Sequence, residues 1–336
     1  MTFVRLPRRT CFAAVARFAV VALALSAAAA PALAQSGKYP ERPIRFVVPF
    51  APGGAIDVMS RPIADAMARD LGQTAVVENR AGAAGNIGAA LVAKAPADGY
   101  TLLVGTSATH GANPALFNSP GYNAVDDFEP IMLWGAVPNI LVVNAAKGDK
   151  TVQEIIERAK RRPDVLTYGS AGTGTSLHLA GVLFEGATGV KMVHVPYKGG
   201  APASVDLMSG NLDMMFDTVA VALPNIRSGK LRPLAVAAAE RHFALPDVPT
   251  FAELGIKGVE AATWAGLFAP KGTPAPVLAS LRQAAEKAMA DPRVLEVLKT
   301  NGVQVMGWPG ERFGGFVASE TKRWGKVVRD AGIQPQ

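Results

Sequence analysis

Two glycine-rich stretches hold the side chains best suited to chemistry in this chain, and that chemistry is anion binding. The first, Tyr168–Leu179, reads YGSAGTGTSLHL. An apolar run precedes it and an apolar helical pattern follows it, which predicts a strand, a loop and a helix N-terminus. Because the first N–H groups of a helix have no intrahelical partner and carry partial positive charge, such a loop suits a small anion. An ordinary capped turn is the alternative interpretation. The candidate ligand contacts in this loop are Ser170, Gly172, Thr173, Gly174, Thr175 and Ser176.

A second loop of the same kind lies far away in the sequence. Pro49–Asp57 (PFAPGGAID) follows the strand-like run Ile44–Val48 and leads into a helical pattern. Two strand–loop–helix units of this type suggest two half-sites that face each other. Asp57 falls in the first turn of the helix, where it would cap the helix, fix the shape of the loop or touch an amine of a ligand. The candidate contacts in this loop are Ala51, Pro52, Gly53, Gly54 and Asp57.

Polar residues also follow other predicted strands, at the place where open α/β sheets bind their ligands. Thr106 and Ser107 follow the predicted strand Tyr100–Val104. Asn86 lies in a further glycine-rich turn before a helix. That turn lacks the GxGxxG spacing and the acidic ribose partner of a dinucleotide site. We therefore take Asn86, Thr106 and Ser107 as candidate contacts of a ligand other than a nucleotide.

Two charged residues, Lys198 and Asp217, follow predicted strands in the second half of the chain. A solvated surface position is the ordinary interpretation of a single charge at such a place. If both side chains face a cleft, Lys198 would pair with a second carboxylate of the ligand, and Asp217 would select a ligand that bears an amine.

The N-terminus has the three features of a secretory signal peptide. Basic residues come first, an Ala/Val/Leu-rich run follows at about Ala13–Ala30, and Ala32-Leu33-Ala34 forms a small-x-small cleavage site before Gln35. A membrane anchor is the alternative, but the apolar run is short and Arg17 interrupts it. We expect residues 1–34 to be removed and the mature protein to reach the periplasm, with Sec or twin-arginine export both open.

Removal of the signal peptide changes the charge balance. It takes away four of the 34 Lys and Arg and none of the 27 Asp and Glu, so the net charge falls from +7 to +3. A nucleic-acid partner thereby loses its main support. The single cysteine, Cys11, lies in the predicted leader, and the four histidines show no close ligand spacing. We expect no metal and no cofactor.

The order of predicted elements indicates an α/β fold with two lobes. Strands alternate with helices, which is typical of parallel sheets flanked by helices. Two apolar runs, Phe128–Val143 and Ala262–Ala269, are suited to cross between lobes. The predicted domains are lobe 1 at 36–137 and 262–336, and lobe 2 at 138–261. Within the first helix, Pro62 predicts a kink or a helix that begins near Ser60.

Several motifs together make the chain similar to a known family, the Bug-type (TctC-like) extracytoplasmic solute-binding proteins of tripartite tricarboxylate transporters. The matching stretches are PFAPGGAID (49–57), VENRAGAAGNIG (77–88), YGSAGTGTSLHL (168–179), VPYKGG (195–200), LPDVPTFAE (245–253) and WAGLFAPKGTPAP (264–276). The resemblance implies a type II periplasmic-binding-protein fold with central sheets flanked by helices. It implies a small carboxylate in the cleft between the lobes, gripped by loops Ala51–Asp57 and Ser170–Ser176 and partly by ordered waters.

The ligands of that family are diverse, so the resemblance names only a class: dicarboxylates, tricarboxylates, amino acids or aromatic acids. The implied partners are the membrane components of a tripartite transporter, or a sensor kinase. A monomer is the default state for a carrier of this kind.

Two other functions were weighed. A secreted serine-type hydrolase would use Ser170 with His178, but the loop lacks the first glycine of GxSxG. The ordinary role of His178 is that of a satisfied histidine at a helix start. An effector domain of a transcription regulator shares this fold, but a signal peptide stands where its DNA-binding helices would be, and we discard it.

Overall fold

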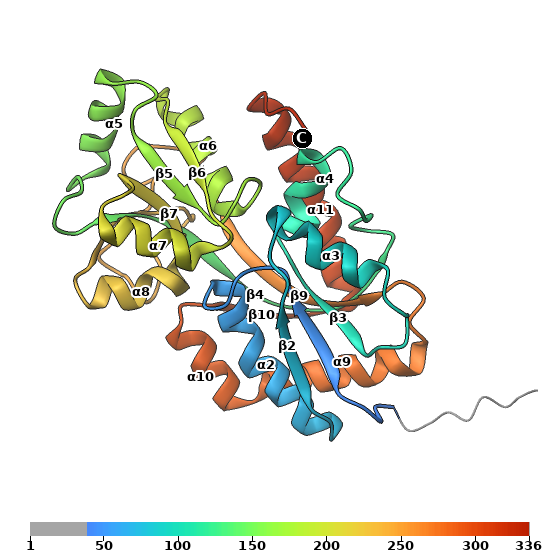
Figure 1. Ribbon diagram of the computed structural model, residues 1–336. Coiled ribbons are helices and arrows are strands. Elements are labelled where there is room, and N and C mark those ends of the chain that lie inside the picture. The colour runs from blue at the N-terminus through green and yellow to red at the C-terminus, as the bar shows by residue number, and fades with distance from the viewer. Residues whose placement is uncertain (1–38, 336) are drawn as a thin grey trace, which may run out of the picture. The chain divides into compact units, whose positions relative to one another are not determined.

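The structure is a computed structural model that describes residues 39–335. The predicted signal peptide, with Cys11 inside it, lies outside the described residues. One compact unit begins at Pro40 and takes in the rest of the described chain, with helices and strands alternating along it (Figure 1). No described helix combines the length and the apolar character needed to cross a bilayer.

The elements up to the middle of the chain are, in order, β1 (Ile44–Val48), α2 (Ala55–Leu71), β2 (Ala75–Asn79), η1 (Ala83–Gly85), α3 (Asn86–Ala93), β3 (Thr101–Thr106), η2 (Ala108–Ala112), α4 (Asn113–Leu116), β4 (Phe128–Asn144), α5 (Val152–Arg161) and β5 (Thr167–Ser170). After these come α6 (Ser176–Thr188), β6 (Val193–Pro196), α7 (Gly200–Ser209), β7 (Met214–Thr218), α8 (Val219–Arg227), β8 (Leu231–Val236), β9 (Ala262–Pro270), α9 (Ala275–Ala290), α10 (Pro292–Thr300), β10 (Gln304–Pro309) and α11 (Gly310–Asp330).

The strands form two sheets that share the long strand β4. In the first sheet β2, β1 and β3 are parallel, whereas β9 pairs antiparallel with both β3 and β4. In the second sheet β6, β5 and β7 are parallel, and β7 and β8 pair antiparallel with β4. The expected alternation of strands and helices and the parallel strands within each sheet are confirmed. The crossing strands β4 and β9 lie inside the strand order and pair antiparallel with their neighbours, which the sequence analysis did not anticipate.

The partner of β4 changes at one point. Pro138 pairs with Ala262 of β9, and the next residue, Asn139, pairs with Thr218 of β7. One continuous strand therefore belongs to the first sheet through Pro138 and to the second from Asn139 onward. The run expected to cross between lobes is this strand.

Two local predictions at helix starts need correction. Helix α2 begins at Ala55 rather than near Ser60, and Pro62 lies inside it. A proline costs one intrahelical hydrogen bond, and the buried residues along α2 show that packing holds the helix despite that loss. The spacing of Thr151 and Glu154 also predicts a capping box at the start of α5. Thr151 Oγ1 does accept from the Glu154 N–H (3.1 Å), but the Glu154 carboxylate accepts from the Lys150 N–H instead of from the Thr151 N–H. Helix α8 and strand β10 were missed.

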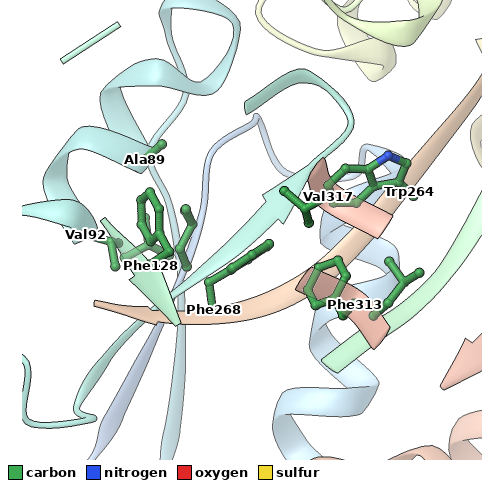
Figure 2. Close-up of a cluster of buried hydrophobic side chains, with 10 residues drawn as sticks. Ala89, Val92, Phe128, Trp264, Phe268, Phe313 and Val317 are labelled. Atoms are coloured by element: carbon green, nitrogen blue, oxygen red, sulfur yellow. The ribbon is translucent and has the colours of Figure 1, made fainter. Parts of the chain in front are cut away.

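A cluster of large apolar side chains holds the first sheet against helices α3 and α11 (Figure 2). The Phe268 ring lies at its centre: the ring centroids of Phe268 and His110 are 4.1 Å apart and stacked, and those of Phe268 and Phe313 are 4.7 Å apart. A Cβ added at Gly105 would lie 2.4 Å from the Phe268 ring, so β3 can approach the ring only with glycine at that position. This packing fixes the end of β3, which leads to Thr106 and Ser107.

Phe268→Ala should reduce the free energy of unfolding by about 3–5 kcal/mol, because it removes a buried aromatic ring from a close-packed cluster. Phe243→Ala is the matched control, since the Phe243 side chain is 49% exposed, and it should change stability by less than about 1 kcal/mol. Chemical denaturation of both variants measures the difference. Equal losses in the two variants would contradict the assignment of Phe268 to the core.

Candidate functional site

A small cavity of about 40 Å³ lies where four helices begin. Its wall includes the first residues or N-caps of α2, α6, α7 and α8, the end of β3, and Thr263 of β9. Elements of both sheets contribute to it. Six of the sequence-predicted contacts line this cavity: Gly54, Thr106, Ser107, Thr175, Ser176 and Asp217.

Three of the four helices that begin at this cavity have no side-chain cap. The N-cap residues of α2, α7 and α8 are Gly54, Gly199 and Thr218, and none of them accepts a hydrogen bond from its helix through a side chain. Helix α6 differs, because Thr175 Oγ1 accepts from the His178 N–H (3.4 Å). An uncapped N-terminus leaves N–H donors for another acceptor. The cavity therefore concentrates free donors and positive dipole ends, which favour an anion.

Several hydroxyl side chains lie in the wall of the cavity. Ser176 Oγ and Thr263 Oγ1 are 2.5 Å apart and join α6 to β9. Thr218 Oγ1, which is buried, has no hydrogen-bond partner among the described residues, and neither has Asn139 Nδ2 behind the cavity wall. Such groups are costly to bury unsatisfied, so they mark a place for a polar guest. Sequence reasoning did not single out Thr218 and Thr263, although both are hydroxyl residues beside an expected strand end.

Asp217 is the acidic residue in the wall of this cavity. Its side chain is fully buried, and the Thr218 N–H donates to Asp217 Oδ1 at 2.7 Å. Burial raises the pKa of this carboxyl to about 8, and the Thr218 hydrogen bond offsets only part of that effect. The surface interpretation of Asp217 is therefore wrong, because the residue ends a buried strand and not an exposed turn.

Ser170 supports the loop that leads into α6 and does not line the cavity. Its side chain is fully buried, and Ser170 Oγ lies 2.6 Å from His194 Nε2 and accepts from the Gly172 N–H at 3.1 Å. The hydrolase interpretation paired Ser170 with His178, but the Gly174 N–H donates to His178 Nδ1 at 3.2 Å. His178 is thus a satisfied histidine at a helix start, and the partner of Ser170 is His194, to which no sequence pattern pointed.

The two imidazole rings behind this loop are stacked, with the centroids of His178 and His194 4.1 Å apart. Burial lowers the pKa of His178 to about 4. Burial, and secondarily the charge of His178, lowers the pKa of His194 to about 3. Both rings are therefore neutral at pH 7, and His178 Nδ1 is free to accept from the loop.

Asp57 holds the other loop. Its Oδ2 accepts from the Gly53 N–H and from Arg61 Nε, each at 3.0 Å, and Asn79 Nδ2 donates to its Oδ1 at 3.0 Å. Burial favours a raised pKa for Asp57, but the hydrogen bonds from Arg61, Gly53 and Asn79 outweigh it and hold the pKa below its usual value. Asp57 does not line the cavity. Of its expected roles, the contacts match the one that fixes the shape of the loop.

A second hollow adjoins the first, and Phe50 and Ala171 line both. It is lined by the turn that contains Ala83 and Ala84, by Phe117, and by predicted contacts Gly172, Thr173 and Lys198. Ala83 and Ala84 adopt φ values of 46° and 53°, a left-handed backbone that is uncommon for alanine. We call this hollow the outer groove. Lys198 is exposed there.

The remaining predicted contacts lie around these hollows without lining them. The Ala51 N–H donates to the Lys198 carbonyl (3.4 Å), so the loop Ala51–Gly54, which includes Pro52, touches the segment before α7. A Cβ at Gly174 would lie 2.7 Å from Leu116, which makes this a close approach that suits only glycine. Asn86 Oδ1 accepts from Asn113 Nδ2 at 2.6 Å and from the Tyr122 hydroxyl at 2.9 Å. Asn86 therefore braces the turn in front of α3.

The described residues contain no group of three or more His, Cys, Asp or Glu side chains placed to hold a metal ion. The polar groups at the cavity are backbone N–H groups, hydroxyls and one buried carboxyl group.

Two sheets that share a crossing strand, with a cavity lined by helix N-termini from both, define the two-lobe fold of periplasmic binding proteins. Residues 59–333 match the family described as the tripartite tricarboxylate transporter family receptor, and the chain belongs to this family of solute-binding receptors. It is 37% identical to Protein BugT of Bordetella pertussis over 317 residues, covering 94% of this chain and 97% of BugT.

Two similar solved structures contain ligands. A Rhodopseudomonas palustris protein, MatC, solved with bound malate, is 36% identical with a TM-score of 0.83, covering 86% of this chain and all of MatC. An R. palustris protein solved with adipate is 37% identical with a TM-score of 0.85, covering 89% of this chain and all of that chain. The resemblance found in the sequence motifs is confirmed.

The buried histidines predict how stability depends on pH. Because their pKa is lowered in the fold, the unfolded chain binds more protons below about pH 6.5, and stability should be lost as the pH falls toward 4. His178→Asn, which keeps an acceptor near the Nδ1 position, should flatten this loss by up to about 1.4 kcal/mol per pH unit. Chemical denaturation at pH 4.5 to 7.5 measures both slopes; parallel curves would show that His178 is protonated in the fold.

Proposed function

We propose that the protein captures a small carboxylate in the cavity where α2, α6, α7 and α8 begin, and delivers it from the periplasm to the membrane components of a tripartite transporter. The observation that carries the proposal is the convergence of four helix N-termini, three of them without a side-chain cap, on one cavity. The alternative partner of the ligand-bound protein is a sensor kinase in place of a transporter. A monomeric carrier suits either partner.

The ligand-bound relatives support this choice of ligand class. MatC was solved with malate and a second R. palustris protein with adipate, both of which are dicarboxylates. Both lobes would contact such a ligand: lobe 1 (36–137 and 262–336) through the start of α2, and lobe 2 (138–261) through the starts of α6, α7 and α8. A ligand that contacts both lobes stabilises a closed arrangement over an open one.

A hydrolytic function is disfavoured by the position of Ser170. Its hydroxyl is fully buried, exchanges hydrogen bonds with Gly172 and His194, and does not line the cavity. A nucleophile must reach the reacting carbon, and this hydroxyl is committed to the shape of the loop. We therefore propose a binding protein without catalytic residues, metal or cofactor.

The outer groove gives room for a ligand longer than the cavity. It shares Phe50 and Ala171 with the cavity and adds the exposed cation Lys198. We propose that one carboxylate lies in the cavity and that a second acidic group of a longer ligand extends toward Lys198. Aromatic side chains of Phe50 and Phe117 cover the apolar part between the two ends.

Ala55→Pro tests the helix N-termini directly. Ala55 is the first residue of α2, where proline fits the helix and removes only an N–H that has no intrahelical partner. Gly54 is extended (φ −77°, ψ 167°), as a residue before proline prefers. The variant should keep its stability and lose roughly 10- to 100-fold in affinity for a bound acid, the value of one charge-assisted hydrogen bond.

The measurement is a thermal-shift and calorimetric screen of residues 35–336, refolded to remove any copurified ligand, against succinate, malate, adipate, citrate and benzoate. An acid at about a hundredfold over its Kd should stabilise the fold by about 2.7 kcal/mol. Val152→Pro, the same change at the start of α5, is the control and should leave binding unchanged, because α5 does not line the cavity. Absence of binding by every acid would overturn the proposed function.

Lys198→Ala should weaken dicarboxylates and leave monocarboxylates unaffected. Because Lys198 is exposed, its attraction is screened, and the expected loss is about two- to fivefold. Titration of adipate and of hexanoate, which share a chain length, separates the second carboxylate from the apolar contacts. Equal affinities of the variant and the wild type for adipate would remove Lys198 from the site.

A further inference from the structure

Asp217 stands out in the wall of the cavity because only one of its two carboxyl oxygens has a hydrogen-bond partner among the described residues. The Thr218 N–H donates to Oδ1 at 2.7 Å, but Oδ2 has no hydrogen-bond partner within residues 39–335 although the side chain is fully buried. The strand order forces this position: Ile140 of β4 lies opposite Asp217, and a Cβ at Gly200 would lie 3.3 Å from Asp217 Oδ1. An unsatisfied buried oxygen in a residue that lines a cavity needs an explanation, and a polar guest in the cavity supplies one.

No cation compensates Asp217 in the described part of the chain. Its surroundings are the β4 backbone, Gly200 at the start of α7, and Thr218 before α8. The charged and titratable side chains on the neighbouring elements have other partners or are exposed: Glu129 pairs with Lys271, His178 accepts from Gly174, Glu185 from Met192, and Asp206 from Tyr197, while Lys198 and Arg227 are exposed.

An ionised Asp217 would oppose the binding of an anion in the cavity. The free N–H groups of α2, α7 and α8 attract an anion into the same space, and a second negative charge a few ångströms away would repel it in a medium of low dielectric constant. Burial raises the pKa of Asp217 to about 8, which favours the neutral acid at pH 7. A neutral acid brings a donor where a carboxylate offers only acceptors.

We propose that Asp217 is a neutral carboxylic acid in the wall of the cavity. Its Oδ2–H donates a hydrogen bond to an oxygen of the bound carboxylate. This inference rests on the proposed function and adds a substrate class to it. The favoured ligands are carboxylates and hydroxy acids, and a zwitterionic amino acid is disfavoured because its ammonium group would meet a donor. The earlier expectation that Asp217 selects an amine is the competing possibility.

Protonation of Asp217 can be measured without any ligand. Infrared difference spectra of wild-type protein against Asp217→Asn at pH 6.5 should show the C=O band of a protonated carboxyl group that the variant lacks. Asp247→Asn is the matched control, because Asp247 is exposed, and its difference spectrum should lack that band. A wild-type spectrum without a protonated carboxyl would overturn the proposal at once, whatever the protein binds.

Donation to the ligand is measured by the affinity for malate and for succinate between pH 6.5 and pH 9.5. Wild-type affinity should be constant to about pH 7.5 and fall about thirtyfold by pH 9.5, as the donor is lost. Asp217→Asn keeps an N–H donor in the same place, so it should bind within about threefold of wild type at pH 7 and show no such fall.

Two results would overturn the proposal while leaving the carrier function intact. One is an equal fall of affinity with pH in the wild type and in Asp217→Asn. The other is tighter binding of glutamate than of malate that Asp217→Asn abolishes, which would show an ionised Asp217 paired with an ammonium group. If neither acid nor amino acid binds, the proposed function fails and this inference fails with it, and the infrared band distinguishes that outcome from a wrong protonation state.

Discussion

The N–H groups at the starts of four helices are the constraint on which the site depends. Each helix of the fold needs acceptors for its first N–H groups, and side-chain caps usually supply them. Gly54 and Gly199 cannot do so, and Thr218 does not. These helices have their starts gathered at one cavity, so their unmet hydrogen bonds accumulate there. Under the proposed function, the unmet hydrogen bonds at three helix ends supply binding energy for the anion.

The sheet arrangement is what brings those ends together. β4 leaves the first sheet at Pro138 and enters the second at Asn139, and the Asn139 N–H donates to the Ala261 carbonyl (2.9 Å) beside β9. One residue thus connects both sheets and the returning strand. Because the helices of each lobe start at the ends of that lobe's strands, the crossing places their N-termini face to face.

Most of the elements could be predicted from the sequence, because apolar periodicity and glycine stops report on single helices and strands. The long run at Phe128–Val143 indicated a crossing, and β4 is that crossing. Helix α8 was missed because Pro224 interrupts its pattern, and β10 because its residues are only partly buried. Strand direction was also missed, since antiparallel pairing of β9 depends on contacts far apart in the sequence that no local pattern encodes.

The site residues, like the elements, could be predicted only in part. Gly54, Thr106, Ser107, Thr175 and Ser176 were found because loops after strands have recognisable composition, and all line the cavity. Ser170 and Asp57 share that composition but hold their loops from behind, through His194 and Arg61. Sequence alone cannot separate a residue that touches a ligand from one that shapes the loop, because both require the same small polar side chains in the same turn.

A cavity built from neutral donors also explains how a carrier can release what it holds. A fixed arginine or lysine inside the cavity would add the Coulomb attraction of a full positive charge to the hydrogen bonds of the anion. The lining residues of the cavity include no lysine or arginine, and Lys198 lies in the outer groove and is exposed to water. Attraction inside the cavity comes from dipoles whose effect falls off within one helical turn. Under the proposed function, separation of α2 from α6, α7 and α8 would take all the donors from the anion in one step, without leaving an unpaired buried cation behind.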